Sequence, residues 1–214
     1  MKDDAALKAK IVLAMLPDVP FEGWSRAALR KAAAKLGHDE AEIESLFPGG
    51  ARDAVACFSA WADHETEKAL ARKKIEALKI RERIALGVKT RLDILAPHRE
   101  AVRRLIAFLA LPANLPLAAR LLYRTTDAIW HAAGDRATDF SFYTKRGLLA
   151  GVYASTSLYW LDDKSKDGAA TSAFLDRRID QVMKIPKLRG RIKEGLDVLP
   201  NPLRALRSFR RGTT

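Results

Sequence analysis

Apolar residues recur every three to four positions along most of the chain, which is the spacing of the buried face of an amphipathic helix. Alanine, leucine, lysine, arginine and glutamate dominate, and no alternating run of β-branched residues indicates a strand. The periodic segments are separated by prolines and glycines, which end helices. The predicted helices are Asp4–Leu16, Ser25–Leu36, Glu40–Phe47, Ala51–Ile75, Lys79–Leu95, Arg99–Leu109, Leu115–Ala133, Asp139–Leu161 and Gly168–Met183. The pattern therefore predicts an all-α protein.

One predicted helix has no charged face. Residues 147–161 contain no charged side chain. A helix that is apolar on nearly every side must be buried all round, so we expect it in the centre of a bundle, in a dimer interface or in the wall of an apolar pocket. The residues before it, 139–146, read Asp-Phe-Ser-Phe-Tyr-Thr-Lys-Arg and mix aromatic with basic side chains, a composition that partner-binding surfaces favour. We call residues 139–146 the collar.

Composition and charge narrow the class of protein. A chain of 214 residues with 48% hydrophobic and 30% charged residues is long and apolar enough for one sizeable core. Its single cysteine, Cys57, allows no internal disulfide and lies in an apolar stretch, which favours a buried structural thiol. Lys and Arg number 38 against 26 acids, a net charge of +12, which predicts an anionic partner: nucleic acid, a phospholipid surface or an acidic protein.

The C-terminal tail carries much of this positive charge. Ile185-Pro186 is predicted to end the compact region, with a hinge at residues 184–187. Beyond it, an apolar stripe with cationic flanks is typical of a helix that lies in an anionic lipid interface. A helix folded back on the body and a nucleic-acid-binding tail are the alternatives, and Gly190 and Gly195 weaken the predicted helix. The residues expected to contact a membrane are Lys187, Leu188, Arg189, Arg191, Ile192, Lys193, Leu196, Leu199, Leu203, Arg204, Leu206, Arg207, Phe209 and Arg210.

The N-terminal segment has the outline of a helix-turn-helix. Ser25 and Asp39 are each placed to cap a short helix, and Glu42 completes a pattern like a capping box. A three-helix head followed by a larger helical body resembles the TetR family of repressors, which implies DNA binding, an apolar ligand and a dimer formed by the last two long helices. The second short helix, however, carries Glu40, Glu42 and Glu44 and no cation, so its carboxylates would face phosphates. We expect no DNA binding by this helix, whose acids can pair with cations of the preceding one.

No pattern predicts catalysis. The four histidines (His38, His64, His98 and His131) are scattered, and no glutamate is followed by histidine at the spacing of a di-iron bundle. Gly-rich phosphate loops and serine nucleophile elbows are missing from the sequence. The uncharged run is too short to cross a bilayer, and no signal or transit segment is recognised at the N-terminus. We therefore expect neither enzyme activity, nor a metal, nor a cofactor.

The chain also resembles a second family, over residues 21–183. The resemblance rests on the collar, on the helix that includes it and on the next helix. Asp139-Phe-Ser-Phe-Tyr-Thr-Lys-Arg-Gly-Leu-Leu-Ala-Gly-Val-Tyr153, Trp160-Leu-Asp-Asp163 and Ala173-Phe-Leu-Asp-Arg-Arg-Ile-Asp-Gln-Val-Met183 resemble the lipid-binding accessory proteins of ubiquinone biosynthesis, the ninth Coq protein family. The resemblance implies a bound isoprenoid or phospholipid in a pocket between the body helices, near Leu105, Phe108, Leu122, Leu148 and Val152. It also implies that Asp139, Phe142, Tyr143, Lys145 and Arg146 contact the di-iron demethoxyubiquinone hydroxylase. Phe142 stands where the animal proteins usually carry Trp.

Together these patterns predict three regions: a degenerate helix-turn-helix head (1–50), a lipid-binding and dimerising body (51–183) and a basic amphipathic tail (184–214). The function expected is a non-enzymatic carrier that takes a polyprenylated quinone intermediate from the membrane and presents it to the hydroxylase. A homodimer, cytoplasmic and peripheral on the inner membrane of a bacterium, is expected. The alternative is a TetR-type repressor that senses an apolar ligand.

Overall fold

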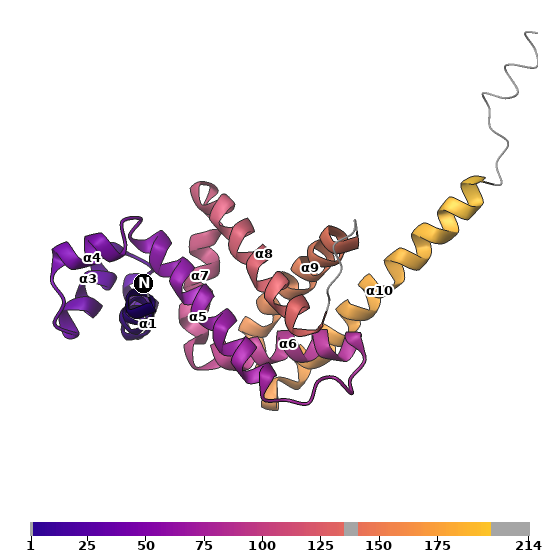
Figure 1. The fold of residues 1–214 in the computed structure, drawn as a ribbon, viewed down its shortest axis with the longest axis horizontal. Helices are drawn as coiled ribbons and strands as arrows, with labels where there is room; N and C mark the ends of the chain where they lie inside the picture. The colour runs from indigo at the N-terminus through magenta and orange to yellow at the C-terminus, as the bar shows by residue number, and fades with distance from the viewer. Residues whose placement is uncertain (1, 135–140, 198–214) are drawn as a thin grey trace, which may run out of the picture.

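The computed structural model describes residues 2–134 and 141–197, with side chains for residues 4–134 and 144–184, and Figure 1 shows an all-helical chain over these ranges. The helices are α1 (Lys2–Met15), α2 (Val19–Glu22), α3 (Arg26–Lys35), α4 (Glu40–Leu46), α5 (Ala51–Ala71), α6 (Ile80–Leu95), α7 (Arg99–Leu109), α8 (Leu115–Ala132), α9 (Ser141–Asp162) and α10 (Ala169–Asp197). Short 3-10 turns lie at Ala96–His98, Pro112–Asn114 and Lys166–Gly168. The predicted all-α fold is confirmed.

The head begins its helices where the capping residues predicted them. The Ser25 hydroxyl accepts from the amide of Ala28 at 3.1 Å, and the Asp39 carboxylate accepts from the amide of Glu42 at 2.8 Å. The capping box is not completed, because the Glu42 carboxylate instead lies 2.9 Å from Nδ1 of His38.

Charges in the head are satisfied within it. Arg30 on α3 pairs with Glu40 on α4 at 2.7 Å, as predicted. Lys31 and Lys35 instead contact Asp18 near α2, at 3.1 and 2.8 Å. These exposed pairs contribute little to stability, but they show that the acids of α4 and the cations of α3 form contacts inside the head.

One continuous apolar core joins the head to the body. It extends from Ile11 on α1 through Phe47 and Phe58 to Ile179 on α10. Within the body, α5 packs on α6 and α8, α8 packs on α9, and α9 packs on α10. Gly87 permits the approach of α6 to α8, because a Cβ at this position would lie 2.9 Å from a methyl carbon of Ile129.

Helix α10 continues to Asp197, so the helix end predicted at Met183 and the hinge predicted at residues 184–187 are wrong, whereas the boundary between body and tail stays a prediction. A proline inside a helix removes one hydrogen bond and favours a kink, but the residues around Pro186 include Lys, Leu and Arg, which are strong helix formers. In Figure 1 the C-terminal half of α10 projects away from the other helices, so it is not folded back on the body up to residue 197.

Helix length and hydropathy together decide whether a helix can cross a membrane. In the described part of the chain, no single helix is both long and apolar enough to cross a bilayer. One bent pair, Ile80–Leu109 with Pro112–Ala132, passes the same test by length and composition, and its two parts meet at 97°.

Candidate functional site

A cavity of about 310 Å³ lies among α5, α6, α7, α8 and α9. Aliphatic side chains form most of its wall, among them Leu92 and Leu95 from α6, Leu105 and Leu109 from α7, and Leu121 and Leu122 from α8. This volume is at the lower end of the range of small-molecule sites, about 300–1,000 Å³, and a mostly apolar lining is typical of such sites. We refer to this cavity as the pocket.

The mouth of the pocket is apolar and open to solvent. Leu115 and Leu158, which line it, are each 54% exposed, and Leu111, at the corner between α7 and α8, is 53% exposed. This corner lies within residues 105–119, an uncharged run as long as residues 147–161. Residues 105–119 were not recognised in the sequence as one uncharged run, because Pro112 and Pro116 divide them between two helices. The absence of charge over residues 105–119 is the signal that could have marked the mouth.

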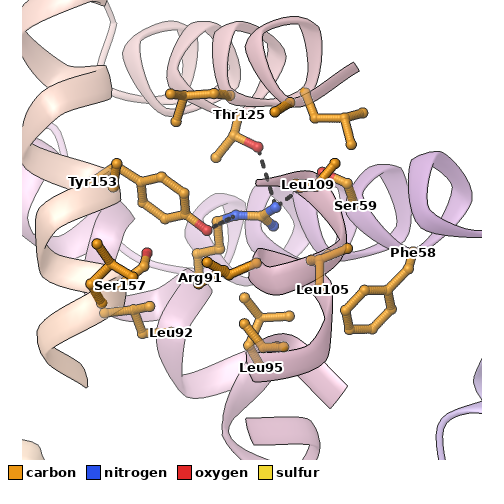
Figure 2. Close-up of a pocket in the computed structure, with 18 of the residues that line it drawn as sticks. Phe58, Ser59, Arg91, Leu92, Leu95, Leu105, Leu109, Thr125, Tyr153 and Ser157 are labelled. Atoms are coloured by element: carbon orange, nitrogen blue, oxygen red, sulfur yellow. Dashed lines mark hydrogen bonds between the residues drawn. The ribbon is translucent and has the colours of Figure 1, made fainter. Parts of the chain in front are cut away.

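The inner side of the pocket contains one buried cation. Arg91 on α6 is 4% exposed, and Figure 2 shows its guanidinium between Tyr153 and Thr125. Its Nε donates to the Tyr153 hydroxyl at 2.9 Å. Its Nη2 donates to the hydroxyls of Thr125 at 3.2 Å and Ser59 at 3.3 Å. Four helices thus converge on one guanidinium.

Asp63 on α5 balances this charge. Its Oδ1 lies 3.1 Å from Nη1 of Arg91 and accepts from the Thr125 hydroxyl at 2.9 Å. Burial raises the pKa of the Asp63 carboxyl, and this effect outweighs the opposing influence of Arg91 and Thr125. We assign the ionised form to Asp63 at neutral pH, because a neutral partner would leave the buried guanidinium uncompensated.

Sequence reasoning missed Arg91, although a signal was present. Arg91 occupies a position in the apolar stripe of α6, in register with Ile84, Val88 and Leu95. A charged residue at a core position of a helix is rarely buried without a partner and often marks a site.

Three buried side-chain atoms in the described part of the chain make no hydrogen bond: Oγ of Ser157, Oγ1 of Thr156 and Nη1 of Arg91, of which Nη1 still has its ion pair with Asp63. Arg91 and Ser157 line the pocket, whereas Thr156 does not. Ser157 follows Tyr153 by one helical turn on α9, so both hydroxyl-bearing side chains lie on the same face of this helix. The pocket therefore combines a long apolar wall with a small group of polar atoms.

Of the five residues predicted to bind lipid, two line the pocket. Leu105 and Leu122 line the pocket. Phe108, Leu148 and Val152 do not: Phe108 packs against the core, and Val152 is buried within it. The face of α9 toward the pocket is formed by Tyr153, Ala154, Ser157 and Leu158. Leu148 and Val152 lie on other sides of α9. Because this apolar run has no polar face, the sequence could not indicate which side of the helix faces the pocket.

The described part of the collar is tied to the body. Arg146 is only 4% exposed, and its Nε donates to the half-exposed Asp127 on α8 at 2.6 Å, while its contact with a partner protein stays a prediction. Nζ of Lys145 lies 5.7 Å from the centre of the Trp130 ring, and the Lys145 carbonyl accepts from the Trp130 indole N–H at 3.2 Å. Asp139 and the side chains of Phe142 and Tyr143 lie outside the described residues.

The uncharged helix is buried on one side only. Leu149, Val152 and Trp160 are buried, whereas Gly147, Gly151, Leu158 and Tyr159 are exposed in the single chain. Tyr159 stacks on Phe174 of α10 with ring centres 4.4 Å apart. The expectation of burial all round is wrong for one chain, and a homodimer through this surface stays a prediction.

The predicted tail contacts lie beyond the described side chains. The backbone of α10 includes residues 187–196, but their side chains are outside the described set, as are residues 198–214 entirely, with Leu199, Leu203, Arg204, Leu206, Arg207, Phe209 and Arg210.

Neither cysteine nor metal chemistry is indicated where the structure is described. Cys57 is half-buried, and burial raises the pKa of its thiol to about 11, which keeps it protonated and unreactive at neutral pH. Within residues 4–134 and 144–184, no group of three or more His, Cys, Asp or Glu side chains is arranged to hold a metal ion.

Comparison with known proteins identifies relatives of the chain. The COQ9 family model matches residues 115–186, which cover α8, α9 and much of α10. The chain is 33% identical to rat and 31% identical to human mitochondrial ubiquinone biosynthesis protein COQ9, in each case over 90% of its length. Identity to the Drosophila melanogaster COQ9 protein is 32% over 84% of the chain. The matches cover 64%, 62% and 56% of these three relatives. The predicted resemblance to this family is confirmed.

A solved structure shows the same fold. The TetR transcriptional regulator from Nitrosomonas europaea ATCC 19718 superposes with a TM-score of 0.67 over 83% of this chain and 98% of its own. Sequence identity is 23%, so this likeness concerns the fold alone. The predicted TetR-like arrangement is confirmed.

Proposed function

From its resemblance to COQ9 over nine tenths of its length, we propose that the chain is a non-enzymatic lipid-binding protein of ubiquinone biosynthesis. It takes a polyprenylated quinone intermediate from the membrane and presents it to the demethoxyubiquinone hydroxylase. The names of the relatives support a place in ubiquinone biosynthesis. The apolar pocket, with exposed leucines at its mouth, is the observation that supports lipid binding.

The physical need for such a protein follows from the chemistry of its cargo. Moving a prenyl tail from a bilayer into water costs about 0.8 kcal/mol for each CH₂ group exposed. The pocket offers an apolar wall to part of the lipid, and Leu111 and Leu115 beside its mouth provide an apolar path to the bilayer. A pocket of about 310 Å³ holds a ring or a short length of chain, so the rest of a long tail stays at the mouth or in the membrane.

The positive charge of the chain supports binding to an anionic membrane. The net charge is +12, and the C-terminal half of α10, in which the basic tail begins, projects from the body. In this proposal the tail docks on the inner membrane of a bacterium, the pocket shelters the lipid, and the collar, through Phe142, Tyr143 and Lys145, docks the di-iron hydroxylase. A second copy packs on the exposed face of α9.

Quinone profiling of a strain that lacks the gene tests this function. We expect demethoxyubiquinone to accumulate and ubiquinone to fall, and the full chain supplied in trans to restore the normal profile. A matched strain supplied with the chain truncated after Met183 separates the tail from the body and is expected to restore less ubiquinone. Normal ubiquinone in the deletion strain would overturn the proposal.

The fold itself favours one alternative, a repressor that senses an apolar ligand. The charges of α4 weigh against it, because Glu40, Glu42 and Glu44 would approach phosphates without a cation on the same helix. A gel shift at low salt against fragments of the genome distinguishes the two functions. We expect weak binding without sequence preference, whereas a sequence-specific complex would favour the repressor.

A further inference from the structure

The polar side chains that line the pocket are Ser59, Arg91, Thr125, Tyr153 and Ser157. Ser157 is 6% exposed and Arg91 is 4% exposed, so both are more than nine-tenths buried. Oγ of Ser157 has no hydrogen-bond partner in the described chain, and Nη1 of Arg91 has only its ion pair with Asp63. Figure 2 shows Tyr153 beside the Arg91 guanidinium, with Ser157 on the same helix. Native proteins pair the great majority of buried polar atoms, so an unpaired hydroxyl on a residue that lines a cavity indicates a missing ligand atom.

The chemistry of these atoms defines the atom that would pair with them. Nη1 of Arg91 is a donor, and the Tyr153 hydroxyl, which already accepts from Nε, has its own hydrogen to donate. The Ser157 hydroxyl both donates and accepts. Donors therefore predominate, and the group that satisfies them is an oxygen acceptor.

The charge of the site decides which oxygen. Asp63 does not line the pocket, but its Oδ1 lies 3.1 Å from Nη1 of Arg91, so a ligand that reaches Arg91 lies close to an ion pair whose charges cancel. A carboxylate or phosphate would gain from Arg91 but would be repelled by Asp63 in the same low-dielectric surroundings. An uncharged carbonyl accepts the same hydrogen bonds without this repulsion and at a lower cost of dehydration.

We propose that Arg91, Tyr153 and Ser157 form a headgroup site that binds the uncharged carbonyl oxygen of an amphipathic lipid, such as a quinone, and that Asp63 selects against anionic headgroups. The inference rests on the proposed function, because it places the ring of the quinone at the polar end of the same pocket. The apolar chain then leaves past Leu115 and Leu158 at the mouth.

Three probes with the same alkyl chain test the headgroup site on the purified full chain: decyl-benzoquinone, decylbenzene and decylbenzoate. Each displaces an uncharged fluorescent probe, N-phenylnaphthylamine, from the protein. The wild type is expected to bind the benzoquinone most tightly. Ser157→Ala is expected to weaken benzoquinone binding about three- to tenfold, the effect of one lost neutral hydrogen bond, and to leave decylbenzene binding unchanged.

Thr156→Val is the matched control. It removes a buried, unpaired hydroxyl from the neighbouring residue of α9, but Thr156 does not line the pocket. The variant is therefore expected to bind all three probes as the wild type does. Asp63→Asn removes the negative charge beside Arg91 and is expected to raise the affinity for decylbenzoate relative to the benzoquinone.

The outcomes separate the headgroup site from the wider function. Equal affinities of the wild type for benzoquinone and decylbenzene, or equal losses for both in Ser157→Ala, would overturn the headgroup site and leave the apolar pocket standing. If no probe binds, both the headgroup site and lipid carriage by the pocket are overturned. Selective quinone binding together with normal ubiquinone in a deletion strain would support the site and overturn the proposed function.

Discussion

Two uncharged runs of equal length, residues 105–119 and 147–161, form opposite parts of the same pocket and differ in what they contribute. The first bends at the corner of α7 and α8 and provides exposed leucines at the mouth. The second is part of the single helix α9 and provides Tyr153, whose hydroxyl accepts from Arg91, and Ser157, which lines the pocket one turn away. Absence of charge thus marks both an exposed apolar corner and a wall that includes buried polar side chains.

The largest effect on stability is expected when the ion pair between Arg91 and Asp63 is broken. Arg91→Ala leaves the Asp63 carboxylate buried without its partner and should lower the free energy of unfolding by about 3–5 kcal/mol. Urea denaturation followed by circular dichroism measures the change. The double variant Arg91→Met with Asp63→Leu removes both charges and should recover most of the loss. A double variant as unstable as Arg91→Ala would show that the instability of Arg91→Ala is not caused by the unpaired carboxylate.

Filling the pocket from the first wall should abolish binding without unfolding the protein. Ala118→Phe places a ring in the pocket and is expected to weaken decyl-benzoquinone binding more than tenfold. Ala119→Phe is the matched control, because Ala119, the next residue along α8, is exposed and does not line the pocket. Equal affinities of the two variants would place the lipid somewhere other than this pocket.

The exposed leucines at the corner of α7 and α8 are expected to contact the membrane. Leu111→Ser combined with Leu115→Ser removes apolar area from the corner and should lower the fraction of protein that floats with anionic liposomes by about three- to tenfold. Tyr123→Ser, an exposed position on the same helix α8, should leave flotation unchanged. Truncation after Met183 should lower flotation as well. Flotation that survives both changes would exclude the corner and the tail as membrane contacts.

The smallest effect is expected at the hydroxyl of Tyr153. Tyr153→Phe keeps the ring but removes the acceptor for Nε of Arg91, which should lower the free energy of unfolding by about 1 kcal/mol. The same denaturation experiment measures it. A variant as stable as the wild type would show that water replaces the hydroxyl and that α9 contributes less to the polar group than its geometry indicates.

The helices could be predicted from local sequence, because prolines, glycines and caps such as Ser25 and Asp39 act within a few residues. The exception is the C-terminal helix, where Pro186 predicts an end but its neighbours continue the helix. Local signals decide where a helix begins more reliably than whether a single proline ends it.

The pocket was only partly predictable, because it depends on how faces meet. Leu105 and Leu122 were placed correctly at its wall, but the rotation of α9 that selects Ser157 over Val152 is set by packing against α8 and α10. The partners of Arg91 come from α5, α8 and α9, which are distant in the sequence. The signal for Arg91 was its place in the apolar stripe of α6, and the signal for the mouth was the uncharged run divided by two prolines.

Identification of the lipid that copurifies with the full chain from its own cells tests the central claim most directly. Mass spectrometry of the organic extract should find a polyprenylated quinone or quinone intermediate with the wild type and with Ala119→Phe, and should find it strongly reduced with Ala118→Phe. Absence of any prenylated quinone from the wild type, or an equal amount bound to Ala118→Phe, would contradict the claim that this pocket carries the intermediate.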